Sequence, residues 1–126
     1  MDNEIKFFRC EHCGNIIAFL HDSGVKVQCC GDDMGLITAQ TADSAGEKHV
    51  PVVTMDGNKV TVTVGSVPHP MEEKHYIEFV ALLTEKGVQV VYLEPGEKPV
   101  AEFSLLTGDK VLETYEYCNI HSLWKA

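Results

Sequence analysis

Hydrophobic and polar residues alternate along much of the chain after residue 50. The clearest run, NKVTVTVG, has valines at positions 60, 62 and 64 with threonines between them, the period of two that is typical of a half-buried strand. The Asp56-Gly57 pair before this run favours a two-residue hairpin turn, because glycine tolerates a positive φ. Further β-rich runs follow in HYIEFVALL, VQVVYLE, PVAEFSLL and KVLETYEY. Turn-forming residues separate them, so the pattern predicts an antiparallel β-sandwich or barrel.

The first part of the chain has a different character. Residues 1–37 hold four of the five cysteines and several glycines, and residues 38–48 (TAQTADSAGEK) are small and polar without apolar periodicity. We therefore predict a small module at 1–37, a linker at 38–48 and a β-domain at 49–126. A module of fewer than about 40 residues buries too little surface to fold alone, so we expect a metal to be part of its fold.

Composition narrows the class of protein. The chain has 126 residues, of which 44% are hydrophobic and 23% charged, with a formal net charge of −9. That charge argues against binding to nucleic acid or to anionic membranes, since both would be repelled, and no apolar run is long enough to span a bilayer. The opening MDNEIKFF lacks the features of an export signal. Five cysteines without such a signal favour a reducing compartment, so we expect a cytoplasmic protein.

Four cysteines form the first chemical pattern: Cys10, Cys13, Cys29 and Cys30. A Cys-x-x-Cys pair brings two thiolates to one metal from a tight turn, and a second pair completes a tetrahedron. The second pair is adjacent in sequence, and neighbouring side chains on extended backbone point apart. Binding one metal through both therefore requires a local bend, which Gly31 permits. Four thiolates suit zinc or iron; a redox dithiol is the less favoured alternative, because no βαβ pattern surrounds it.

Histidines form the second pattern. His49, His69, His75 and His121 all lie in the β-rich part, and Cys118 stands three residues before His121. Taken singly, each histidine is more typical of a surface or a satisfied core position. Prolines on both sides of His69 nevertheless hold its loop in one shape, as a preorganised ligand requires. A Cys–His hydrolase is disfavoured because no acyl-transfer motif accompanies the pair, whereas the spacing of three suits one metal.

Five segments that contain these cysteines and histidines follow one another along the chain: CEHCGN, CCGDDM, EKHVPV, GSVPHPMEEKH and YCNIHSLWKA. With these segments the chain resembles the desulfoferrodoxins, the two-iron class of superoxide reductases. The resemblance implies a desulforedoxin-like module followed by an immunoglobulin-like antiparallel β-sandwich. It also implies two irons per chain, Fe(Cys)4 and Fe(His)4(Cys). The implied ligands are Cys10, Cys13, Cys29 and Cys30 for the first iron, and equatorial His49, His69, His75 and His121 with axial Cys118 for the second.

The same resemblance implies the activity. Superoxide would be reduced by one electron to hydrogen peroxide without release of dioxygen, as a detoxification in an anaerobe or microaerophile. Five protein ligands leave a sixth position open for a small oxidant. The family's Glu-Lys pair falls on Glu47, which would occupy that position after the product leaves, and on Lys48, which would attract superoxide and orient water. A one-electron donor such as rubredoxin and a homodimer are implied as well.

Two other functions stay open from the residues alone. One is a non-catalytic iron protein that only transfers electrons. The other is a zinc-ribbon interaction module joined to a β-sandwich, with incidental histidines. Metal analysis separates the zinc module from the iron proteins, and reactivity with superoxide separates the reductase from the electron carrier. Trp124 is expected to pack around the site or across strands, as aromatic residues on strands do.

Overall fold

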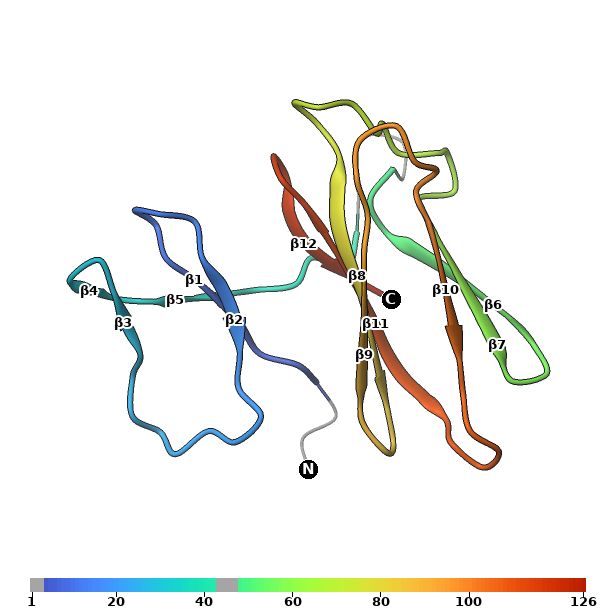
Figure 1. The fold of residues 1–126 in the computed structure, drawn as a ribbon, viewed down its shortest axis with the longest axis horizontal. Coiled ribbons are helices and arrows are strands. Elements are labelled where there is room, and N and C mark those ends of the chain that lie inside the picture. Colours follow the sequence, from blue (N-terminus) through green and yellow to red (C-terminus); the bar gives the residue numbers. More distant parts are fainter. Residues whose placement is uncertain (1–3, 43–47) are drawn as a thin grey trace. The chain divides into compact units, whose positions relative to one another are not determined.

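The chain forms two compact units, Met1–Thr38 and Ala39–Ala126, in a computed structural model (Figure 1). The structure describes residues 4–42 and 48–126, and these contain strands, turns and irregular segments but no helix. Within those two ranges, accordingly, no helix is long and apolar enough to cross a membrane. The predicted mainly-β fold class is confirmed.

The small unit is built from very short strands. They are β1 (Phe7–Arg9), β2 (Ile16–Ala18), β3 (Gln28–Cys29), β4 (Asp32–Asp33) and β5 (Gly35–Ile37). Three of them form an antiparallel sheet in the order β2-β1-β5, and β3 pairs with β4 as a hairpin. Only Phe7, Cys10 and Met34 are buried apolar residues among those described in this unit. Strands of two or three residues are too short to show alternation, which is why the sequence pattern did not predict them.

The larger unit is a sandwich of two antiparallel sheets. In the part that the structure describes, one sheet has the order β10-β7-β6 and the other β12-β11-β8-β9. The strands are β6 (Pro51–Asp56), β7 (Lys59–Val64), β8 (Ile77–Thr84), β9 (Val88–Tyr92), β10 (Val100–Ser104), β11 (Val111–Cys118) and β12 (Ser122–Lys125). Sheets of three and four strands are typical of immunoglobulin-like domains. The five alternating or β-rich runs correspond to β7, β8, β9, β10 and β11, whereas β12 was not predicted.

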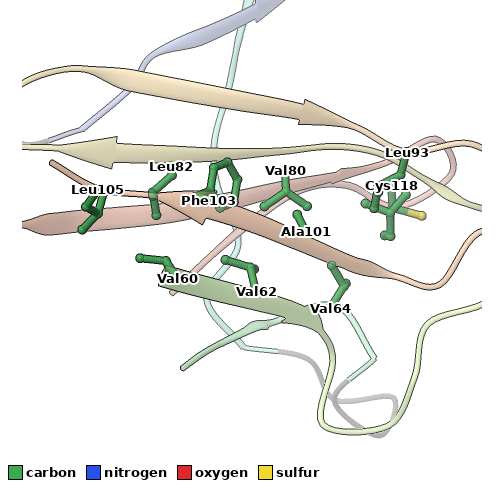
Figure 2. Close-up of a cluster of buried hydrophobic side chains, with 11 residues drawn as sticks. Val60, Val62, Val64, Val80, Leu82, Leu93, Ala101, Phe103, Leu105 and Cys118 are labelled. Carbon is green, nitrogen blue, oxygen red and sulfur yellow. The ribbon is translucent and has the colours of Figure 1, made fainter. Parts of the chain in front are cut away.

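The valines of β7 form one side of the core. Val60, Val62 and Val64 are fully buried, as the alternation predicted, and they lie in one apolar cluster with Val80 and Leu82 of β8 from the opposite sheet (Figure 2). Because successive side chains of a strand point to opposite faces, the intervening threonines are left outside this cluster. The core therefore joins the two sheets through β7 and β8.

The β6–β7 hairpin turns one residue later than predicted. Asp56 pairs with Lys59, so the two loop residues are Gly57 and Asn58 rather than Asp56 and Gly57. Gly57 has φ of 61° and Asn58 is not in the left-handed region, as in a type II′ turn, where glycine takes the first central position. The turn is shifted because the register of the hairpin is set by the face of β7 that must be buried.

Antiparallel pairing brings the histidine-bearing segments to one end of the sandwich. His49 precedes β6, which begins where β7 ends, and His69 follows β7. In the other sheet His75 precedes β8, which begins beside Cys118 at the end of β11, and His121 precedes β12. Strand pairing thus gathers the candidate ligands of each sheet at one end, and the packing of the two sheets brings both sets together.

Replacement of Leu82 by alanine tests the core. Leu82 is fully buried, so Leu82→Ala is expected to lower the free energy of unfolding by about 2–5 kcal/mol, through lost burial and the cavity left behind. Denaturant unfolding followed by fluorescence of Trp124, the single tryptophan of the chain, measures the sandwich unit. Leu106→Ala is the control, because Leu106 is 83% exposed; equal losses in the two variants would contradict the assignment of the core.

Candidate metal centres

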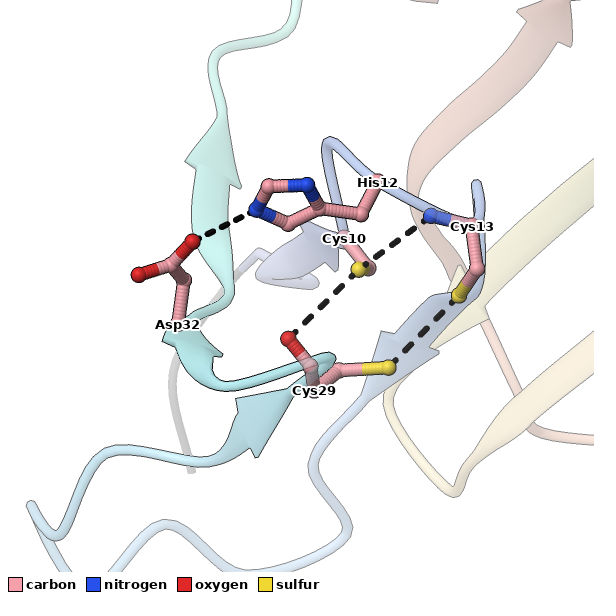
Figure 3. Close-up of polar contacts among 5 residues, drawn as sticks. All are labelled: Cys10, His12, Cys13, Cys29 and Asp32. Carbon is pink, nitrogen blue, oxygen red and sulfur yellow. Dashed lines mark hydrogen bonds and ion pairs between the residues drawn. The ribbon is translucent and has the colours of Figure 1, made fainter.

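The four cysteines of the small unit meet at one point. The sulfur atoms of Cys10, Cys13, Cys29 and Cys30 all lie within 4.8 Å of one another. Cys10 follows β1, Cys13 lies in the next turn, and the other two belong to the β3–β4 hairpin. The structure thus brings together all four cysteines of the predicted first centre. Figure 3 shows three of them with their polar contacts.

A tight turn presents Cys10 and Cys13. The Gly14 amide donates to the Cys10 carbonyl at 2.9 Å, and the Cys10 amide donates to the Asn15 carbonyl at 2.9 Å. Gly14 adopts φ of 84°, a conformation that glycine takes without steric cost. The Cys13 amide points at the Cys10 sulfur at 3.5 Å, and the Asn15 side-chain amide at the Cys29 sulfur at 3.7 Å. Amide donors around the sulfurs favour thiolates over thiols.

The bend that adjacent cysteines require is present. Cys29 pairs with Asp32 across the hairpin, so Cys30 and Gly31 are its two loop residues. Their φ angles are 54° and 84°, both positive as in a type I′ turn. Cys30 itself therefore adopts the left-handed conformation, which is uncommon outside glycine. The sequence pattern predicted the bend and the role of Gly31, but not that Cys30 shares it.

The four thiols are so close together that all of them would ionise only around a cation. The hydrogen bond from the Cys13 backbone lowers the pKa of Cys10 to about 6. Sulfur contacts with Cys10, Cys13 and Cys29 instead raise the pKa of Cys30 to about 12, and the contact with Cys13 raises that of Cys29. The protein alone thus stabilises one thiolate but not four together. A bound metal ion would supply the positive charge that ionises the others.

His12 stands apart from the sulfurs, although it lies between two of these cysteines in the sequence. Its Nε2 atom is 2.5 Å from the Oδ2 atom of Asp32, and both side chains are exposed (Figure 3). This pair joins the Cys10–Cys13 turn to the β3–β4 hairpin at the surface.

Four histidines of the sandwich unit form a closed ring. The imidazole centroids of His49 and His69 are 4.7 Å apart, those of His69 and His75 4.7 Å, those of His75 and His121 5.1 Å, and those of His121 and His49 4.7 Å. Across the ring, the His49–His75 separation is longer, at 6.5 Å. Four groups at the corners of a square have this pattern of short sides and a longer diagonal.

The ring nitrogens are placed as metal ligands are. His69 Nδ1 donates to the Pro70 carbonyl at 2.7 Å, which leaves its Nε2 atom with a free lone pair. That atom and Nε2 of His75 are buried, and neither has a hydrogen-bond partner among the described residues. His49 Nε2 and His121 Nδ1 lie 3.1 Å apart. Two nitrogens about 2.1 Å from one ion, at right angles, are separated by about this distance.

Cys118 adds a thiol to this ring. Its sulfur belongs to a group with ring nitrogens of His49, His75 and His121, all within 4.8 Å of one another. His69 lies outside that tight group, although its ring neighbours two of its members. Cys118 is fully buried, and the His121 amide donates to its sulfur at 3.4 Å. A β-bulge precedes it, because Tyr117 pairs with Phe79 but Cys118 pairs with Ile77, and bulges redirect side chains beside functional sites.

Burial sets the protonation of the site. It lowers the pKa of His69 to about 4, with the neighbouring imidazoles contributing, so this ring is neutral at pH 7 and can bind a metal. Burial also raises the pKa of the Cys118 thiol, which would ionise there only with a compensating cation. Desolvation lowers the pKa of His75, and the neighbouring His121 and His49 lower it further.

Asn119 was not singled out from the sequence. It lies in the turn between β11 and β12, and its Oδ1 atom accepts from the Tyr76 amide at 2.9 Å while its Nδ2 atom donates to the Lys74 carbonyl at 3.1 Å. Lys74 and Tyr76 flank His75, so one side chain ties the His75 segment to the turn that carries Cys118. Asparagine in a turn was the only signal available, and its partners are set by tertiary structure.

Gly65 is a second residue that the sequence did not reveal. It follows β7 with φ of 81°, and a Cβ atom there would lie 2.5 Å from the backbone oxygens of Lys48 and Val67. The backbone next to His49 can approach so closely only because glycine has no side chain. Lys48 itself is exposed. Glu47, the other member of the predicted pair, lies outside the described residues.

These features define a class of protein: an all-β chain with a four-thiol group in a small unit and, in a sandwich unit, a ring of four imidazoles with a thiol beside three of them. Two family models match, desulfoferrodoxin over residues 41–126 and the desulfoferrodoxin N-terminal domain over residues 2–37. The chain belongs to the desulfoferrodoxin family.

Individual relatives agree over the full length. The chain is 48% identical to desulfoferrodoxin from Nitratidesulfovibrio vulgaris and 44% identical to that from Syntrophotalea carbinolica, covering 100% of this chain and 98% of each relative. The crystal structure of the superoxide reductase from Treponema pallidum superposes with a TM-score of 0.86 at 36% identity, over 99% of both chains.

Gly65→Ala tests the close approach beside His49. The added methyl group would collide with two backbone oxygens, so we expect the free energy of unfolding to fall by at least about 2 kcal/mol more than in Gly57→Ala, and metal to be retained less well by the histidine group. Gly57 is a matched control, because its φ is also positive but nothing lies within 4 Å of its added Cβ. Denaturant unfolding and metal analysis after gel filtration measure both effects. Equal behaviour of the two variants would show that the contact with Lys48 is unimportant.

Proposed function

We propose that the chain is a superoxide reductase. It reduces superoxide by one electron and, with two protons, forms hydrogen peroxide at an iron ion in the sandwich unit. The proposed ligands are His49, His69, His75, His121 and Cys118. The observation that carries the proposal is the ring of four imidazoles, in which two buried Nε2 atoms have no hydrogen-bond partner among the described residues and a buried thiol lies alongside. Support also comes from the likeness to a superoxide reductase over 99% of both chains.

The donor set fits iron and leaves room for a substrate. Imidazole nitrogens and one thiolate suit iron, and five protein ligands leave one octahedral position open. His121 is exposed, so the group reaches solvent, from which a small anion and protons can enter. Ferrous iron, when bound, supplies the electron, and a thiolate ligand increases its electron donation.

A second iron would occupy the four-thiol group of Cys10, Cys13, Cys29 and Cys30. The domain match to the desulfoferrodoxin N-terminal domain covers this unit, and four sulfurs within 4.8 Å of one another suit a tetrahedral ion. This iron would close the Cys10–Cys13 turn onto the β3–β4 hairpin, which gives the small unit the stability that its few buried residues lack.

Lys48 would attract the substrate. The chain carries a net charge of −9, which repels superoxide at long range, and Lys48 is an exposed cation next to His49 in the sequence. Its backbone packs against Gly65 at the end of β7, which supports a place near the ring. A local positive charge at a site raises the rate at which anions arrive, and an ammonium group can also orient water for proton delivery.

Several further parts of the proposal rest on the sequence. Glu47 would take the sixth position once peroxide has left. A one-electron donor such as rubredoxin would return the iron to the ferrous state, and the active form would be a homodimer. Five cysteines used as metal ligands suit a reducing compartment such as the cytoplasm.

Cys118→Ser tests the proposed centre. The wild-type chain is expected to bind two irons and, after a superoxide pulse in pulse radiolysis, to yield hydrogen peroxide without dioxygen. Cys118→Ser is expected to lose one ferric–thiolate absorption and the reaction, while the spectrum of the four-thiol centre is kept. Cys13→Ser is the matched control. It is expected to lose the absorption of the four-thiol centre and to keep that of the histidine centre.

Other outcomes would contradict the proposal. A single zinc ion per chain would favour an interaction module, and two irons without a reaction with superoxide would favour an electron-transfer protein. Release of dioxygen in step with peroxide would indicate dismutation instead of reduction.

Lys48→Ala tests electrostatic attraction. We expect the bimolecular rate constant with superoxide to fall about tenfold at low ionic strength, and its dependence on salt to weaken, because a steering charge is lost. Lys110→Ala removes the same charge from the far end of β11, about 25 Å from Cys118 at the usual rise per strand residue. Lys110 is likewise exposed. An unchanged rate and salt profile in Lys48→Ala would remove this residue from the mechanism.

A further inference from the structure

Two side chains that are not candidate ligands donate hydrogen bonds to the same backbone carbonyl, that of His121. The His121 carbonyl accepts a hydrogen bond from Gln40 Nε2 at 2.9 Å and another from Trp124 Nε1 at 3.0 Å. A carbonyl oxygen has two lone pairs, so both are used. The peptide that follows His121 is thereby fixed from two directions, immediately beside a candidate ligand.

Gln40 is itself held in place by backbone hydrogen bonds. Its amide donates to the Leu123 carbonyl at 2.9 Å, and the Lys125 amide donates to its carbonyl at 2.9 Å. These bonds form an isolated parallel bridge between Gln40 and Trp124. The segment around Gln40, which the sequence pattern assigned to a linker, is therefore anchored along the edge of β12.

Trp124 acts on a second histidine as well. Its ring stacks on the His49 imidazole with a centroid separation of 4.7 Å and an interplanar angle of 14°. Trp124 is buried, so the indole has little freedom to turn. His49 Nε2 and His121 Nδ1 lie 3.1 Å apart. The indole of Trp124 therefore contacts two neighbouring histidines: it holds the backbone of His121 and the ring plane of His49.

We propose that Gln40 and Trp124 are positioning residues that set the orientation of the His121 and His49 imidazoles toward the iron of the sandwich unit. The proposal rests on the ligand assignment made for the superoxide reductase activity. Neither side chain is a ligand or contacts the reacting atoms. Each acts through a histidine, and Gln40 makes the segment before the β-domain a part of that site.

Hydrogen-bonded partners that orient metal ligands typically change metal affinity or activity by 10- to 100-fold when removed. Gln40→Leu keeps the approximate size of the side chain but removes the donor to His121. Trp124→Phe removes the Nε1 donor and keeps an aromatic ring against His49. If both residues position the ring, each variant is expected to release iron from the histidine centre to a chelator at least about tenfold faster than the wild type.

The experiment uses the full iron-loaded chain and reads the two centres separately. We expect Gln40→Leu and Trp124→Phe to shift the ferric–thiolate absorption of the histidine centre and change the rhombicity of its electron paramagnetic resonance signal. The four-thiol centre of the same molecule is the internal reference, and its spectrum is expected to stay the same. The rate constant with superoxide is recorded as a further readout.

Gln89→Leu is the matched control variant. Gln89 Nε2 also donates to a backbone carbonyl, that of Ser104 at 3.0 Å, but Gln89 lies on β9 opposite Leu82, five residues along β8 from Ile77. Its loss is expected to leave both centres unchanged. Gln40→Glu is a second variant of matched size that places a carboxylate against the His121 carbonyl, and it is expected to perturb the histidine centre at least as strongly as Gln40→Leu.

Two results would overturn the positioning role: an unchanged spectrum and chelator release in Gln40→Leu and Trp124→Phe, or changes no larger than those in Gln89→Leu at equal thermal stability. A wild-type chain with both ferric centres but no reaction with superoxide would contradict the proposed function, while the spectra would still decide the positioning role. A wild-type chain without a histidine-bound iron would overturn both.

Discussion

Antiparallel strand pairing is the constraint on which the histidine ring depends. Because each strand of such a pair begins beside the end of its neighbour, residues just before β6, β8 and β12 lie close to residues just after β7 and at the end of β11. Four of the five candidate ligands lie in segments between strands, and Cys118 is the last residue of β11. A core that fixes the register of β7 against β6 and of β8 against β11 therefore also brings the ligand-bearing segments together, and side chains such as Asn119, Gln40 and Trp124 then hold them.

Among the described residues of the small unit, no extensive core positions the candidate metal site. Its buried apolar residues are few, its strands have two or three residues, and one of its cysteines adopts a left-handed backbone conformation. In such a unit the four sulfurs are the principal connection between the Cys10–Cys13 turn and the β3–β4 hairpin. Metal binding and folding would then be coupled, whereas the sandwich has an extensive hydrophobic cluster, to which the candidate ligand Cys118 itself contributes.

The sequence predicted the features that depend on residues close together in the chain. Alternation at Val60, Val62 and Val64 identified β7 and its buried face, and the motif resemblance named both groups of ligands that the structure gathers. Contacts created by the tertiary fold left no such signal. Gln40 lies in a polar stretch with no periodicity, yet it bonds to residues more than 80 positions away, and Gly65 is indistinguishable in sequence from a glycine in open solvent such as Gly57.

The left-handed Cys30 in its two-residue turn has a consequence for metal selection. The hairpin presents its two sulfurs beside those of Cys10 and Cys13, and four thiolates suit any thiophilic tetrahedral ion, so zinc would be accepted there as well as iron. The imidazole ring is shaped beforehand by two sheets, and it offers a geometry with five donors that zinc rarely adopts in structural sites. Replacement of iron by zinc in the small unit would therefore remove one ferric–thiolate absorption and leave the histidine group itself unaltered.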